Sequence, residues 1–156
     1  MGEITIRAAR PEEAAELAAL CRRSKAHWGY DAQFLRRCAA SLTVSPASID
    51  KGHVLAAQDG RGAVLGVASI AALDDPGDFD LPHLFVEPAA IQGGIGRLLF
   101  RAIARLAKRT GARRLVILSD PFAAPFYERM GARTIGDAPS DSIPGRRLPL
   151  LHYELR

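Results

Sequence analysis

Several features that mark specialised protein classes are scarce or missing in this sequence. Its 156 residues contain two cysteines, Cys21 and Cys38, and two thiols without neighbouring Cys or His residues do not form a zinc site. No run of about 18 apolar residues occurs, which excludes a transmembrane helix. The N-terminus lacks the basic segment and apolar core of a signal peptide. We therefore expect a cytoplasmic protein with reduced thiols and no metal.

Lysine is also scarce, with 3 Lys against 18 Arg, and the net charge is +4. The arginines are spread along the whole chain, and no helix-turn-helix, zinc-finger or RNP motif accompanies them. This distribution gives little support to nucleic acid binding. The chain is 48% apolar and 24% charged, which is typical of a globular protein. Its length fits a single domain over residues 1–156.

The apolar periodicity predicts a sheet with flanking helices. Helices are expected from Pro11 onward, over 31–40, from the glycine cluster around Gly94 to Gly111, and over 124–130. Seven segments have the pattern of strands: 3–8, 53–58, 63–73, 79–86, 115–119, 133–135 and 148–155. The segment 79–119 is a β-α-β crossover, so its two strands should be parallel, and the others antiparallel. We predict an α/β (α+β) fold with a mixed, mostly antiparallel sheet of six to seven strands.

The most informative stretch is a strand followed by glycines and a long amphipathic helix, LPHLFVEPAAIQGGIGRLLF. Glycines let the backbone bend closely around an anion, and the first turn of a helix offers free N–H groups. We interpret residues 92–97 as a pyrophosphate-binding loop. No Gly-Lys-Ser/Thr follows, so this is not a Walker loop, and the third glycine of a dinucleotide fingerprint is missing. Simple turn glycines remain the alternative.

Two motifs in this sequence resemble those of one enzyme family. The first is Val86-x-Pro88 followed by Gly94-Ile95-Gly96 and a Leu-Leu helix. The second runs from Ser119-Asp120-Pro121 to Phe126-Tyr127-Glu128 and Met130-Gly131. Their order and spacing resemble the GNAT superfamily of N-acetyltransferases over nearly the whole chain. Two positions depart from the family pattern, since Ile91 replaces a frequent Gln or Arg and Phe122 replaces a common Asn.

The resemblance implies a GNAT-like fold and an acetyl-CoA-dependent acyltransferase. An amine of a small molecule or protein would attack the thioester directly. The strand before the glycine loop would diverge from its parallel neighbour, and the pantetheine arm would lie in the gap near Val86. The residues that the resemblance assigns to acetyl-CoA are Leu84, Phe85, Val86, Gln92, Gly93, Gly94, Ile95, Gly96, Arg97, Asp120 and Tyr127.

The resemblance also implies an acid and a base. Tyr127 matches the tyrosine that often protonates the leaving thiolate, although packing beside Phe126 is the alternative. Asp80, His83 and Glu87 are the candidate bases for the incoming amine, and the family pattern favours Asp80. Strict alternation along a strand would place Asp80 on the opposite face from His83 and Glu87, unless a bulge shifts the parity.

The acceptor is expected over the first two helices and the loop at 137–147. Trp28 and Tyr30 are candidate substrate-binding residues, with anchoring of the interhelical loop as the alternative. Acidic and basic residues of the late loop give opposing indications about the charge of the substrate. A non-catalytic acyl-CoA-binding module and a basic nucleic-acid or protein interaction domain are the alternative functions. Homodimers are common for such folds.

Overall fold

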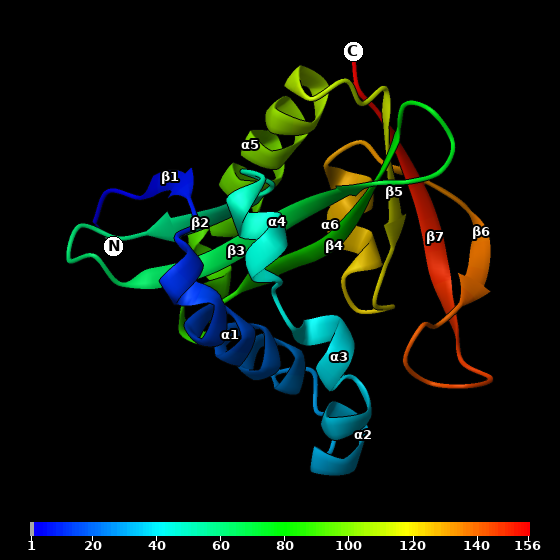
Figure 1. The fold of residues 1–156 in the computed structure, drawn as a ribbon. Helices are drawn as coiled ribbons and strands as arrows, with labels where there is room; N and C mark the ends of the chain where they lie inside the picture. The colour runs from blue at the N-terminus through cyan, green and yellow to red at the C-terminus, as the bar shows by residue number, and fades with distance from the viewer. Residues whose placement is uncertain (1) are drawn as a thin grey trace.

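The computed structural model describes residues 2–156 and contains one seven-stranded sheet with the order β1-β2-β3-β4-β5-β7-β6 (Figure 1). Among the strands of the described residues, only β4 and β5 pair in parallel, and all other neighbours are antiparallel, as predicted. The strands are β1 (Thr5–Ala8), β2 (Val54–Gln58), β3 (Val64–Ala72), β4 (Asp78–Val86), β5 (Arg114–Leu118), β6 (Arg133–Pro139) and β7 (Arg147–Glu154).

Helices cover both faces of the sheet (Figure 1). One face carries α1 (Ala14–Ala26), α2 (Ala32–Arg37), α3 (Ala39–Leu42) and α4 (Pro46–Asp50), and the other carries α5 (Ile95–Arg109) and α6 (Ala124–Arg129). Two 3-10 turns, η1 (Pro11–Glu13) and η2 (Pro88–Gly93), precede α1 and α5. Among residues 2–156, no helix is both long enough and apolar enough to span a membrane.

The two faces have separate hydrophobic cores. The α5 stripe of Ile95, Leu99 and Ile103 is fully buried against the sheet, as its period predicts. Gly66 of β3 permits this close approach, because a Cβ there would lie 2.6 Å from Leu99 Cδ1. The second core lies under α1 and contains Cys21. Burial raises the pKa of the Cys21 thiol to about 12.

The structure corrects the prediction of the helical region between β1 and β2. Asp31 caps α2 as predicted, and its Oδ1 accepts a hydrogen bond from the Phe34 amide at 2.8 Å. The single helix expected over 31–40 is wrong, because Cys38 (φ −88°, ψ −2°) interrupts it between α2 and α3. Helix α4 was not predicted, although Ser45 caps it by accepting from the Ala47 amide at 3.1 Å.

Strands β4 and β5 separate soon after they meet. Their pairing covers only Asp78–Asp80 against Arg114–Val116, whereas β4 continues to Val86 and β5 to Leu118. The remainder of β4 is hydrogen-bonded to β3 on its other side. The divergence expected from the family resemblance is therefore present. We call the space between residues 81–86 of β4 and residues 117–118 of β5 the wedge.

Candidate active site

A bulge in β4 places two of the candidate bases on one face of the sheet. His83 lies opposite Ser69 of β3, and Asp80 lies opposite Ala71. The chain therefore takes three residue steps in β4 from Asp80 to His83, but only two steps in β3 from Ser69 to Ala71. Residues directly opposite each other in a sheet share a face, and so do residues two apart on a regular strand. Asp80 and His83 therefore share the face that carries α1–α4, and the strict alternation considered above does not hold here.

Asp80 and His83 have different surroundings on this face. The Asp80 carboxyl is half-buried, and burial raises its pKa, with a further increase from the charge of Asp141. His83 is 8% exposed, and its Nδ1 lies 2.6 Å from Ser69 Oγ. Burial lowers the pKa of His83. Its Nε2 is buried and has no hydrogen-bond partner within residues 2–156, so a substrate or a water could reach this nitrogen only if the packing around it opened.

Glu87 is engaged with α1. Its Oε2 accepts a hydrogen bond from Arg23 Nη2 at 2.7 Å, and its Oε1 accepts from Arg23 Nε at 2.9 Å. A substrate ammonium would have to displace this guanidinium before it could use the carboxylate. The geometry therefore favours Asp80 over Glu87 as the base.

The backbone of β4 presents polar groups to the wedge. The Glu87 amide donates to the Leu65 carbonyl of β3 at 2.8 Å. Because the backbone groups of successive strand residues point to opposite sides, those of Leu84 and Val86 point away from β3. No strand among residues 2–156 pairs with them there, since β5 pairs with β4 only as far as Asp80. Their side chains join the α5 core, whereas Phe85 packs on the α1 side.

The glycine loop opens α5 next to the wedge. Gly94 adopts φ +79°, a left-handed conformation that favours glycine. Gln92 and Gly93 form the last turn of η2. The backbone amides of Ile95, Gly96 and Arg97 have no acceptor in the described part of the chain. Gly96 faces the wedge side, because a Cβ there would lie 3.4 Å from the Phe126 ring and 3.8 Å from Val86.

Tyr127 lies in α6, among the aromatic rings of Phe100 and Phe126. Its side chain is buried, and its hydroxyl makes no hydrogen bond within residues 2–156. Burial raises its pKa, and the negative charge of Asp120 adds to this shift. The phenol therefore keeps its proton through the neutral range, as a general acid requires.

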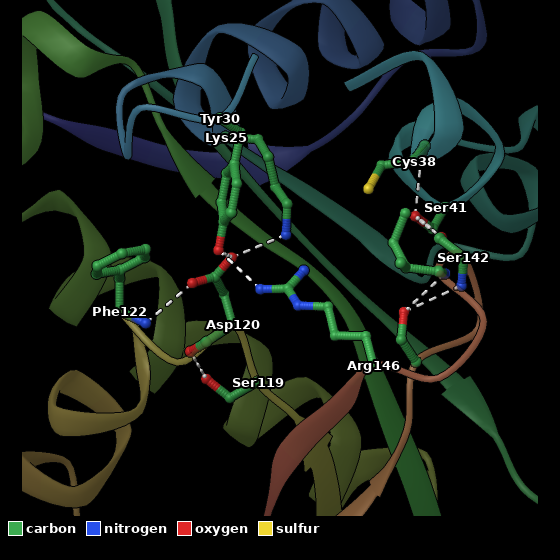
Figure 2. A network of polar contacts seen from close by, with 11 residues as sticks. Lys25, Tyr30, Cys38, Ser41, Ser119, Asp120, Phe122, Ser142 and Arg146 are labelled. Carbon is green, nitrogen blue, oxygen red and sulfur yellow. Dashed lines mark hydrogen bonds and ion pairs between the residues drawn. The ribbon is translucent and has the colours of Figure 1, made fainter. Parts of the chain in front are cut away.

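Asp120, two residues after the end of β5, is the centre of a polar cluster that we call the clasp (Figure 2). Its Oδ2 accepts from Lys25 Nζ and from the Tyr30 hydroxyl, each at 2.9 Å, and its Oδ1 accepts from the Phe122 amide at 2.9 Å. Arg146 Nη2 donates to the Tyr30 hydroxyl at 2.8 Å. These protein donors already occupy the Asp120 carboxylate. The contact between the Asp120 side chain and the cofactor stays a prediction.

The two aromatic residues predicted to bind substrate take different positions around the clasp. Tyr30 stacks on Phe34, with ring centroids 4.2 Å apart, and lies inside the cluster. Trp28 is 38% exposed and stacks on Phe122, which is 53% exposed. Lys25 and Phe34 were not singled out in the sequence. The residues around Lys25 in the sequence do not indicate its role, since its partner Asp120 is 95 positions away.

The arrangement fits acetyl-CoA in two independent respects. Three free helix amides beside a left-handed glycine suit a diphosphate, and the unpaired edge of β4 suits an extended arm with amide groups. Within residues 2–156, no group of three or more His, Cys, Asp or Glu side chains is placed to hold a metal ion.

The comparisons with known proteins agree with this geometry. Residues 50–131, more than half of the chain, match the family model of the acetyltransferase (GNAT) domain. The chain therefore belongs to the GNAT family and is an acyltransferase. Among curated proteins, none matches the sequence.

Solved structures share the fold. The PaiA N-acetyltransferase from Thermoplasma acidophilum, crystallised with coenzyme A, has a TM-score of 0.77 at 16% identity, over 97% of this chain and 99% of that one. YncA from Salmonella typhimurium, a putative acetyltransferase crystallised with acetyl-CoA, has a TM-score of 0.73 at 21% identity, over 99% and 95%. N-acetylglutamate synthase from Neisseria gonorrhoeae has a TM-score of 0.72 at 21% identity. The match covers all of this chain but only 36% of that protein.

Proposed function

We propose that this chain transfers the acetyl group of acetyl-CoA to a primary amine by direct attack. The observation that supports the proposal most is the wedge, which opens beside the free amides of α5. When bound, acetyl-CoA supplies an activated acetyl group as a thioester. The amides of Ile95, Gly96 and Arg97 would hold its diphosphate, and the Val86 amide would donate to the thioester oxygen as negative charge develops there.

The proton transfers use groups on both sides of the wedge. Asp80 or His83 would accept the proton of the attacking amine, directly or through a water. Tyr127 would give its proton to the departing thiolate. A phenol is an intrinsically weaker acid than a thiol, but burial disfavours the charged form of both groups and therefore also raises the proton affinity of the thiolate.

Calorimetry with acetyl-CoA, followed by an amine panel that monitors CoA release, tests the proposal. We expect saturable binding and release of CoA that depends on the amine. Binding without transfer to any amine would instead indicate a non-catalytic acyl-CoA-binding module. No binding at millimolar acetyl-CoA would contradict the proposal altogether.

A further inference from the structure

Arg146 is a half-buried cation without a carboxylate partner. Its only side-chain hydrogen bond runs from Nη2 to the Tyr30 hydroxyl at 2.8 Å, and no Asp or Glu within residues 2–156 forms an ion pair with it. A guanidinium carries five N–H donors, so most of its donors have no acceptor in the described chain. The adjacent Arg147 differs, because its Nε donates to Asp137 Oδ1 at 2.6 Å.

The Arg146 side chain is nevertheless held in place. Its Cζ lies 4.9 Å from the centroid of the Phe34 ring and 5.3 Å from that of Tyr30, which is the geometry of a cation–π interaction. The Tyr30 hydroxyl accepts from Arg146 and donates to Asp120, and this chain of bonds fixes the orientation of the guanidinium (Figure 2). A positioned guanidinium with free donors is suited to bind a carboxylate.

The position of Arg146 relates it to the proposed chemistry. It belongs to the loop between β6 and β7, which also carries Asp141, whose charge raises the pKa of Asp80. It is joined through Tyr30 to Asp120, whose charge raises the pKa of Tyr127. Arg146 thus shares a loop with Asp141 and a chain of hydrogen bonds with Asp120.

The charges of the clasp favour an anion at this place. Lys25 Nζ, 2.9 Å from Asp120 Oδ2, already forms an ion pair with that carboxylate. The positive charge of Arg146 is therefore left uncompensated by any ion pair in the described chain. An acceptor ammonium would be repelled here, whereas an acceptor carboxylate would be attracted.

We propose that Arg146 binds a carboxylate of the acceptor, so that the acceptor is an amino acid or a similar amine with a carboxylate group. This inference rests on the proposed acetyl transfer and specifies its substrate class. Binding of the carboxylate by Arg146 would leave the amine free to reach the thioester in the wedge. Arg146 is then a specificity-determining residue for the reaction.

The test compares acids with their uncharged analogues. Glycine, alanine, phenylalanine and glutamate are assayed as acetyl acceptors beside their carboxamides and two amines without a carboxylate, phenethylamine and spermidine. We expect acetylation of at least one amino acid with kcat/KM well above that of its carboxamide. Arg146→Gln should lower kcat/KM for this acid by about 10- to 100-fold, the loss typical of a charged hydrogen bond, and should lower kcat/KM for the carboxamide by a much smaller factor.

Matched variants separate recognition from folding. Arg147→Gln removes an exposed neighbouring cation and should leave the ratio between acid and carboxamide unchanged. Arg146→Lys retains the charge and should recover part of the activity on the acid. A direct readout is calorimetry of the N-acetylated amino acid with the CoA-bound enzyme, in which binding should be weaker for Arg146→Gln and unchanged for Arg147→Gln.

The possible outcomes distinguish the two proposals. Transfer only to phenethylamine or spermidine would overturn the role of Arg146 and leave the acetyltransferase proposal intact. Equal losses on acid and carboxamide in Arg146→Gln would also overturn it. Binding of acetyl-CoA without transfer to any of these amines would contradict the proposed function, and the inference about Arg146 would fail with it.

Discussion

At the scale of single residues, the role of Tyr127 can be tested by removing one oxygen atom, that of its hydroxyl group. Tyr127→Phe removes only the hydroxyl, which makes no hydrogen bond within the described chain, so packing around the ring should be retained. We expect kcat to fall by about 100-fold, as for loss of a general acid, with an unchanged Kd for acetyl-CoA. Single-turnover kinetics and calorimetry measure the two quantities separately.

Tyr153 offers the matched control for this variant. It is the other tyrosine that contacts Phe100, with ring centroids 4.9 Å apart, and it lies in β7. Tyr153→Phe should leave kcat unchanged. If Tyr127→Phe is as active as the original enzyme over the whole pH range, Tyr127 is a packing residue.

The pH dependence of the reaction tests the choice of base. Because burial and Asp141 raise the pKa of Asp80, kcat/KM should fall on acidification at a higher pH than for an ordinary carboxylate. Asp141→Asn removes one of the causes that raise the pKa, so this decrease should move to lower pH. Titration of the amine itself is common to all variants, and the difference between their pH profiles therefore reports on the enzyme.

Asp80→Asn completes this experiment. It should lower kcat/KM by about 100-fold and abolish the difference that Asp141→Asn makes. A profile that keeps the same acidic decrease in Asp80→Asn would point to His83, and His83→Gln would then remove it. The lowered pKa of His83 means that its ring is neutral at pH 7, in the form that accepts a proton.

At the scale of one element, helix α5 has a left-handed glycine at each end. Gly94 precedes its first residue with φ +79°, and Gly111 follows its last turn with φ +105°; a Cβ at either position would meet no atom within 4 Å. Alanine should therefore cost similar stability at both positions, about 1 kcal/mol from backbone strain. Only Gly94→Ala would also disturb the amides that we propose to hold the diphosphate.

Calorimetry of the two glycine variants provides the measurement. Gly94→Ala should raise the Kd for acetyl-CoA by about 10-fold, equivalent to about 1.4 kcal/mol. Gly111→Ala should leave this Kd unchanged and should lower the melting temperature about as much as Gly94→Ala does. If both variants bind equally well, the loop after η2 does not grip the cofactor.

At the scale of the whole molecule, the sequence predicted the sheet better than the site. The apolar period of α5 and the alternating strands are local properties, so the order of elements and the parallel pairing of β4 with β5 could be predicted. The shared face of Asp80 and His83 could not, because the bulge depends on how β4 pairs with β3. The clasp between Lys25 and Asp120 had no local signal either, since contacts over such separations arise only from the fold.

The clasp joins the two halves of the sheet across the wedge. Apart from the three pairs of residues shared by β4 and β5, Lys25 of α1 and Asp120 after β5 provide a direct link between the halves. Their side chains are 13% and 11% exposed. Removing one partner therefore leaves a charge that water solvates only partly, and this is more damaging than removing both.

We therefore expect Asp120→Asn to lower the free energy of unfolding by about 1–3 kcal/mol. Lys25→Met should cost less, because the Tyr30 hydroxyl and the Phe122 amide still donate to the Asp120 carboxylate. The double variant should lose less than the sum of the two single losses. Asp137→Asn breaks the exposed pair with Arg147, whose side chains are 59% and 57% exposed, and should change stability by only about 0–1 kcal/mol. Urea unfolding of the four variants measures these differences, and strictly additive losses at Lys25 and Asp120 would show that the clasp does not couple the two halves.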